Sequence, residues 1–151
     1  MWRLRTYHME PNPKNSILES FIPKSNQTSE DIFAPVFLAH ARLYCFAHVR
    51  LIKPLEVLVL GKLHKTLMEF KLFSERVGDV LELARYVYSN ANTPDRALDG
   101  KIDDLRQLVV EYIACEIDTI GQSKGFTELM EEGVEFVGDF WGLARPFLMV
   151  H

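Results

Sequence analysis

Three side chains that bind protons or metals, His40, Tyr44 and His48, recur at every fourth residue of an apolar stretch. On a helix this spacing places them along one face, where two histidines four residues apart can share a metal ion. His40 and His48 are eight residues apart, which is about 12 Å along a helix axis, so they cannot bind the same ion. We therefore interpret them as histidines that flank a helix seam.

The two cysteines, Cys45 and Cys115, are each flanked by apolar residues. A reactive thiolate needs a helix N-terminus or nearby cations, and neither sequence context provides them. We predict that both are buried, free thiols with a packing role in a reducing compartment, rather than partners in a disulfide.

Adjacent acids, such as Asp103-Asp104 and Glu131-Glu132, are the remaining candidates for catalysis. General acid–base pairs need a pocket that separates their pKa values, whereas adjacent acids on a helix usually form a solvated face or a first turn. The sequence also lacks the common nucleophile, phosphate-binding and zinc motifs. We predict no catalytic, cofactor-binding or metal-binding residue, and no enzyme activity.

The most apolar stretch, residues 35–70, predicts two helices that meet at Pro54. The first begins near Pro35, with Asp31 as a candidate cap, and is apolar on more than half of its circumference, so we expect it to be mostly buried. Further helices are expected at about 74–88, 101–121 and 126–144, with Ser74 and Ser123 at two of the starts. The prediction is an all-α fold of about five helices.

Composition and charge limit the classes of partner. A chain of 151 residues is one domain by default, and a net charge of −4 argues against a nucleic-acid interface. No apolar run approaches the length of a membrane span, and the start has no apolar signal segment, so we expect an intracellular protein of the nucleus or cytoplasm. A mild basic cluster around the first helix pair suits an acidic partner or simply keeps the apolar hairpin in solution: Arg42, Arg50, Lys53, Lys62 and Lys65.

The string from residue 35 to residue 67 resembles the end of a BTB/POZ domain of the type abundant in filamentous fungi. The residues that carry this resemblance are His40-Ala41, Leu43-Tyr44, Ala47, Pro54-Leu55 and Lys62-Leu63-His64. Later strings resemble the helical tails of the same proteins: Glu75-Arg76-Val77, Arg85-Tyr86-Val87-Tyr88-Ser89-Asn90, Leu105-Arg106, Val109-Val110, Glu135-Phe136-Val137 and Asp139-Phe140-Trp141. The match covers about residues 34–145, and the order and spacing of the strings make it specific.

The resemblance implies a BTB-like C-terminal helix pair at 34–70, a BACK-like three-helix extension at 71–151 packed on it, and an irregular lead-in at 1–33. The chain departs from the family at His48-Val49-Arg50, where an Asp-Lys-Tyr sequence is usual. It also lacks the strands and first helices of the BTB core. Because the main dimer interface of complete members lies in that missing part, the resemblance does not imply homodimerisation.

What the resemblance implies about function is protein–protein interaction without enzymatic activity. In this family the work is that of an adaptor, including recruitment of a cullin-type ubiquitin ligase scaffold through helices that correspond to residues 35–69. Binding would bury apolar side chains inside a polar rim. The candidate partner-binding residues are Phe37, Tyr44, Arg50 and Leu51.

Three alternatives remain open at this point. A transcription-regulatory scaffold would bind other proteins in the nucleus, although the sequence has no basic import run. A helical-bundle enzyme would need a pocket with convergent polar groups, which the sequence does not suggest. A truncated BTB product with little activity would explain the missing strands, and a longer transcript would decide that case.

Overall fold

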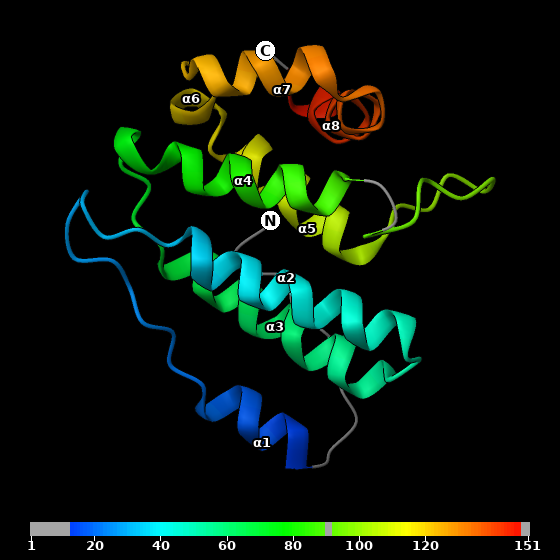
Figure 1. Ribbon diagram of the computed structural model, residues 1–151. Helices are drawn as coiled ribbons and strands as arrows, with labels where there is room; N and C mark the ends of the chain where they lie inside the picture. Colours follow the sequence, from blue (N-terminus) through cyan, green and yellow to red (C-terminus); the bar gives the residue numbers. More distant parts are fainter. Residues whose placement is uncertain (1–12, 90–91, 149–151) are drawn as a thin grey trace.

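The computed structural model describes residues 13–89 and 92–148 and contains only helices and loops in these ranges (Figure 1). The all-α prediction is therefore confirmed, while the expected count of about five helices is too low. The elements are α1 (Pro13–Ser20), α2 (Ala34–Val49), α3 (Lys53–Glu69), the 3₁₀ helix η2 (Ser74–Arg76), α4 (Val77–Tyr88), α5 (Asp104–Cys115), α6 (Ile117–Ile120), α7 (Lys124–Glu132) and α8 (Val134–Leu148).

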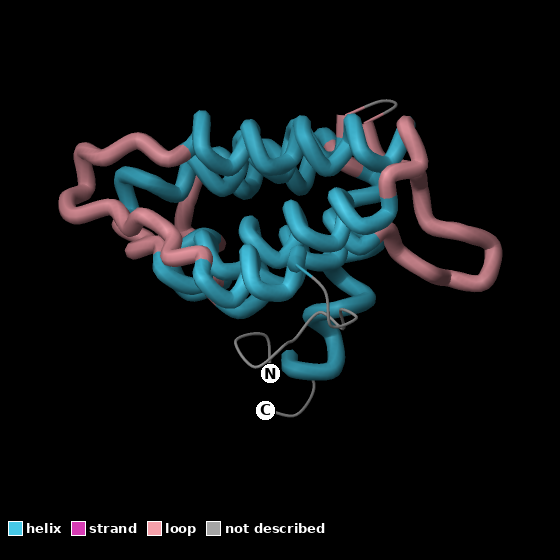
Figure 2. Tube along the Cα trace, turned by 90° about the horizontal axis from the view of Figure 1, so that it is seen from below, coloured by secondary structure: helices cyan, strands magenta, loops and turns pink. Residues whose placement is uncertain are grey.

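The helices α2 and α3 form an antiparallel hairpin across the middle of the molecule (Figure 1). Both helices carry a proline in the first turn, where its missing N–H is not needed. The predicted corner near Pro54 is confirmed, because α2 ends at Val49 and α3 begins at Lys53. The α4–α5 pair lies above the α2–α3 pair and runs in roughly the same direction (Figure 1), and the connecting loops gather at the ends of the helices (Figure 2).

The lead-in before α2 differs from the prediction of irregular chain throughout residues 1–33. Residues 13–20 form α1, which packs on α3, and residues 1–12 lie outside the described part of the chain. Asp31 does not cap α2. Its Oδ2 accepts the backbone N–H groups of Gln27 and Thr28 at 2.7 and 3.1 Å, closing a turn within the lead-in. The N-cap of α2 is Phe33, whose N–H donates to Asp79 of α4 at 2.7 Å.

Three of the predicted helix bounds also need correction. Ser74 begins η2, and Arg76 stands at the N-cap of α4. The expected helix 101–121 divides at Glu116 into α5 and α6, and the expected helix 126–144 divides at Gly133 into α7 and α8. A period of 3.6 residues continues across such one-residue breaks, so apolar spacing alone does not locate them. The Ser123 cap is confirmed, because its hydroxyl accepts the N–H of Gly125.

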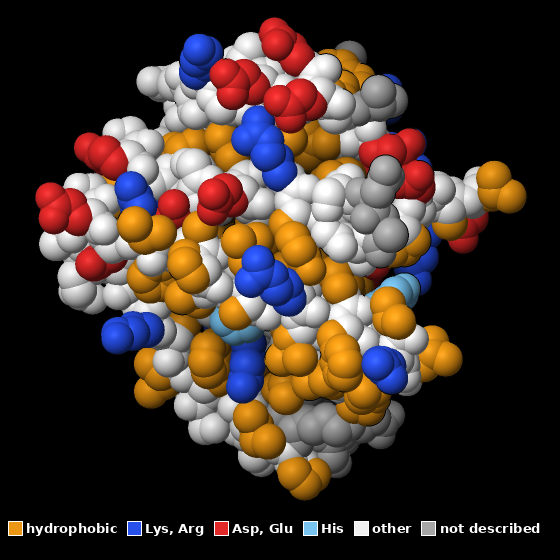
Figure 3. All heavy atoms as spheres, in the orientation of Figure 1, with side chains coloured by type: hydrophobic (Ala, Val, Ile, Leu, Met, Phe, Trp, Pro, Cys, Tyr) orange, Lys and Arg blue, Asp and Glu red, His pale blue; other side chains and the backbone are white. Residues whose placement is uncertain are grey.

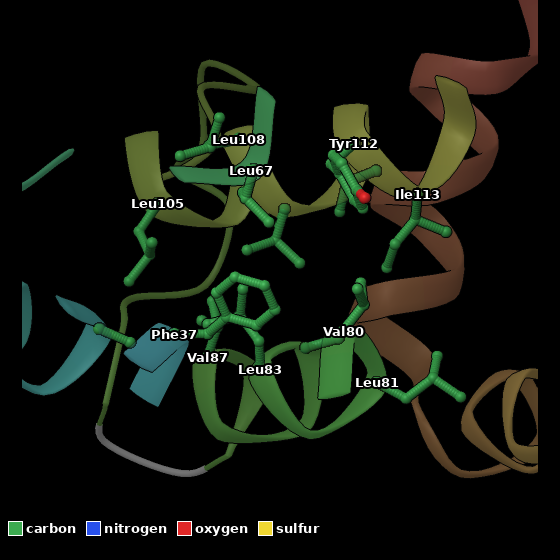
Figure 4. Packing of buried hydrophobic residues seen from close by; sticks show 14 of the residues in the cluster. Phe37, Leu67, Val80, Leu81, Leu83, Val87, Leu105, Leu108, Tyr112 and Ile113 are labelled. Carbon is green, nitrogen blue, oxygen red and sulfur yellow. The ribbon is translucent and has the colours of Figure 1, made fainter. Parts of the chain in front are cut away.

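One cluster of buried apolar side chains connects α2, α3, α4, α5, α7 and α8 (Figure 4). Its largest fully buried members include Phe37, Leu83, Leu105 and Phe136. Cys45 lies in this cluster as a free thiol, as predicted, but Cys115 is exposed at the end of α5, so the prediction that both thiols are buried is wrong for Cys115. Among the described residues, no helix combines the length and the apolarity that crossing a membrane requires.

Candidate protein-interaction surface

Helix α2 has almost no polar side, yet it lies at the surface of the molecule. Its inner side packs on α3 and α4 through buried residues that include Phe37, Ala41, Tyr44 and Cys45. An amphipathic surface helix turns polar residues outward, whereas a helix that is apolar all round is normally covered on every side. Helix α2 is not covered on every side, so some of its apolar residues face solvent.

These residues form one stripe, which we call the outer face of α2: Val36, Ala39, Leu43, Phe46 and Arg50. Val36 is 37% exposed, Leu43 is 42% exposed and Phe46 is 50% exposed. The spacings of seven and three residues between them place all three on the same side of a helix. The expectation that α2 is mostly buried is therefore wrong for this face.

The outer face continues into the turn between α2 and α3, where Leu51 is 88% exposed. The N–H of Ile52 donates to the carbonyl of Ala47 at 2.8 Å, and the N–H of Leu51 donates to that of His48 at 3.2 Å. This is the Schellman ending of a helix, in which the residue at the Leu51 position adopts a left-handed conformation and is usually glycine. Leu51 has a φ of 58°, so a bulky side chain occupies a position that favours glycine.

The charges within the segment that contains α2 have one sign. From Ile32 to Leu55 the chain contains three Arg or Lys residues and no Asp or Glu. The guanidinium of Arg50 lies over the ring of Phe46 at 5.5 Å, and that of Arg42 lies over the ring of Tyr86 at 5.8 Å. Figure 3 shows the result: hydrophobic side chains interspersed with Lys and Arg cover the middle of this view, while acidic side chains gather above them.

The structure divides the four candidate partner-binding residues into two pairs. Phe37 has no exposed surface and packs against Phe70 with ring centroids 5.0 Å apart, and Tyr44 is 3% exposed and donates its hydroxyl to Asp103 at 3.1 Å. Neither side chain reaches a partner, so these two predictions of direct contact are corrected. Arg50 and Leu51 are both exposed and lie next to each other at the C-terminal end of the outer face.

A groove of about 720 Å³ opens at the other end of the outer face, between the lead-in and α2. Val36 belongs to both the groove and the outer face, and the apolar side chains of Phe21, Ile22 and Ile32 extend the apolar surface beyond it. His40 also lines the groove, and burial lowers the pKa of its imidazole, which favours the neutral ring. Asp31 is the acidic residue of this lining.

Buried polar groups form hydrogen bonds that connect different helices and loops. Asp139 of α8 is 1% exposed and accepts hydrogen bonds from Tyr88 at 2.6 Å and from the guanidinium of Arg96. Burial, followed by the hydrogen bond to Asp139, raises the pKa of the Tyr88 hydroxyl. Within the described residues, no group of three or more His, Cys, Asp and Glu side chains is placed to hold a metal ion.

The sequence contained a sign of the residues that were missed. The apolar character of the helix predicts that Val36, Leu43 and Phe46 are buried, but α3 and α4 cover only the inner side of α2. Arg42 and Arg50 within this apolar segment indicate that one side of the helix meets solvent, because charged side chains are rarely buried without a partner.

Comparisons of the chain with models of protein families, with curated proteins and with solved structures give no significant match.

Proposed function

We propose that this chain is a non-enzymatic protein–protein interaction module of the BTB/POZ type, which works as an adaptor for a cullin-type ubiquitin ligase. In this proposal α2 and α3 correspond to the last helix pair of a BTB domain, and α4 to α8 correspond to a BACK-like helical extension. The sequence strings between residues 34 and 145 support the family assignment, and the surface of α2 supports the assignment of an interaction role.

One observation carries the proposal: the outer face of α2 is apolar and exposed on a helix that has no acidic residue. Complete burial of a Leu or Phe side chain contributes about 1.5–3 kcal/mol. Leu43 and Phe46 are 42% and 50% exposed, so a partner that covers them would gain about half of that from each. Together with the fully available Leu51, these side chains form a small set of anchors of the kind that dominates interface energetics.

The proposal is tested by affinity capture from native fungal lysate with the full chain as bait. The variant Leu43→Asp/Phe46→Asp places charge on the outer face, and Trp141→Asp is a matched control because Trp141 of α8 is also 50% exposed. Circular dichroism of each variant checks that the helices are retained. We expect proteins that are retained by the wild type and by Trp141→Asp and lost with Leu43→Asp/Phe46→Asp, and we expect a cullin among them.

Two outcomes would count against the proposal in different ways. If the captured proteins are lost with Leu43→Asp/Phe46→Asp but include no ligase component, the chain is an interaction module and the adaptor role is rejected. Capture of the same proteins by all three forms of the bait, or recovery of chaperones alone, would reject the outer face of α2 as the interaction surface.

A further inference from the structure

We infer that the outer face of α2 accepts one amphipathic helix whose flanks are acidic. This inference rests on the proposed function and specifies the kind of segment by which a partner binds. The shape of the surface, its charge and the charge distribution of the rest of the molecule each contribute to the argument.

The shape of the surface suits a helix lying along α2. The distance from Val36 to Arg50 is about 21 Å along the helix axis, which a partner helix of about 14 residues covers. Two cation–ring pairs involve the helices that pack on α2: Lys62 of α3 lies over the ring of Phe21 at 5.2 Å, and Arg42 lies over the ring of Tyr86 of α4 at 5.8 Å. Apolar anchors at helical spacing would pack on Leu43 and Phe46.

The cations at the rim of the outer face, Arg42, Arg50 and Lys62, favour acidic residues on the flanks of a docked helix. No carboxylate of the described residues lies within ion-pair distance of Arg42, Arg50 or Lys62, whose charges therefore remain available to a partner. Lys53, at the turn, shares Glu56 with His48, so it contributes less. Asp31 is the acid among the residues that line the groove, and its carboxylate accepts hydrogen bonds from the N–H groups of its own turn. Glu or Asp on either flank of a docked helix would meet unpaired cations.

A second copy of the chain does not meet these requirements. Two outer faces packed about a two-fold axis through their middle would bring the two Arg42 side chains close together, and residues 32–55 offer no acid to pair with them. The acids of the chain are instead concentrated far from α2 in sequence: residues 99–139 contain eleven Asp or Glu and three Lys or Arg. The net charge of −4 also makes an anionic membrane a poor occupant.

The test is a selection of random 16-residue peptides displayed on phage against the immobilised full chain. Peptides are counted only if they are retained by the wild type and by Trp141→Asp and are lost with Leu43→Asp/Phe46→Asp. We expect these peptides to share apolar residues at i, i+3 or i+4, and i+7, together with an excess of Asp and Glu. A representative peptide should bind at least about tenfold more weakly to Arg42→Glu/Arg50→Glu and also more weakly at high salt.

Several results would overturn the inference. These are a selection with no peptide that responds to Leu43→Asp/Phe46→Asp, enriched peptides that are neutral, basic or proline-rich, and charge reversal at Arg42 and Arg50 that leaves the affinity unchanged. Concentration-dependent dimerisation that is lost with Leu43→Asp/Phe46→Asp would assign the face to a second copy. Binding to vesicles of phosphatidylserine and phosphatidylcholine that is lost with the same substitutions would assign the face to a membrane.

The proposed function fails separately from this inference. If the lysate partners respond to Leu43→Asp/Phe46→Asp but contact the face through a segment that is not an acidic helix, the interaction module stands and the inference is wrong. If acidic helical peptides bind while no lysate protein responds to these substitutions, the inference stands and the proposed adaptor is wrong.

Discussion

At the scale of single residues, the proposed function places stability and binding in opposition at Leu51. Its φ of 58° is a left-handed conformation, which costs a residue with a Cβ about 1–2 kcal/mol. Its side chain is 88% exposed, so packing within the chain does not offset that cost. The turn needs the left-handed conformation, so the strain comes from leucine standing where glycine is usual, and it places a leucine beside Arg50.

Leu51→Gly is therefore expected to raise the free energy of unfolding by about 1 kcal/mol, because glycine adopts the left-handed conformation without a Cβ penalty. The same change should weaken capture of the partner, because an anchor is removed. Urea unfolding followed by circular dichroism measures the first effect, and the capture experiment measures the second. A loss of stability would show that the leucine side chain supports the turn, and unchanged capture would show that it contacts no partner.

Asp103 illustrates how burial makes an ordinary helix cap sensitive to pH. Its carboxylate accepts the N–H groups of Leu105 and Arg106 and the hydroxyl of Tyr44, which connects α5 to α2. Burial nevertheless raises the pKa of the Asp103 carboxyl, against the lowering effect of these hydrogen bonds. The folded state therefore holds this proton at a pH where the unfolded chain, with a pKa of about 3.9, has lost it.

The sign of the pH effect follows from proton linkage. As pH rises from about 3.9 through the raised pKa of the folded state, the contribution of Asp103 to stability decreases, and the loss persists at higher pH. Asp103→Asn keeps a capping side chain that does not titrate. Its stability relative to the wild type should increase with pH across this window and then level off. Asp103→Ser should show the same trend in urea unfolding, and a difference that is flat or decreases with pH would contradict the explanation.

At the scale of elements, the hairpin could be predicted from the sequence and the short helices could not. The prolines at 35 and 54 mark two helix starts by chemistry that depends only on local backbone geometry, and α2 and α3 begin within a residue of them. Helix α1 has eight residues, too few for a periodic pattern, and its helical form is supported by tertiary contacts to α3. The breaks at Glu116 and Gly133 likewise interrupt a pattern that continues on both sides.

The packing of α1 on α3 depends on the absence of a side chain at Gly61. A Cβ built at Gly61 would lie 2.8 Å from a methyl carbon of Leu18, and Lys65 of α3 donates to the carbonyl of Leu18. Gly61→Leu should displace α1 by overpacking and should speed tryptic cleavage after the exposed Lys24 by about tenfold, because a less firmly held lead-in opens more often. Cleavage products identified by mass spectrometry provide the measurement.

Gly78→Ala in α4 is the matched control, because a Cβ at Gly78 meets nothing within 4 Å. It should stabilise the protein by about 0.5–1 kcal/mol through helix propensity and leave cleavage after Lys24 unchanged. Equal cleavage rates for Gly61→Leu and the wild type would show that α1 does not depend on this contact.

At the scale of the whole molecule, charge is divided between two regions. The segment around α2 is cationic and apolar, and the segment from residue 99 to residue 139 is acidic. Such a separation orients an approaching partner before contact is made, with an effect that weakens as ionic strength rises. The net charge of −4 does not show this division, because the three cations of residues 32–55 offset part of the excess of eight acids in residues 99–139.

Of the four candidate residues named from the sequence, two lie at the surface and two are buried. The exposed residues Arg50 and Leu51 follow from the predicted corner, because turn residues lie at the surface. Phe37 and Tyr44 differ from Val36 and Phe46 only in which side of α2 they occupy, and that depends on how α3 and α4 pack against the helix. A helix that is apolar on nearly all sides has no polar side to mark which residues face solvent. Its sequence therefore does not determine which side packs against the rest of the fold.

The most direct test of the interaction surface is site-specific photo-crosslinking in native lysate. A benzophenone amino acid replaces Phe46 in one form of the full chain and Trp141 in another, two positions with the same 50% exposure. The proposal predicts one dominant adduct from position 46, containing a ligase component, and none of the same mass from position 141. Adducts that form equally at both positions, or only at position 141, would contradict the assignment of the outer face of α2 as the partner-binding surface.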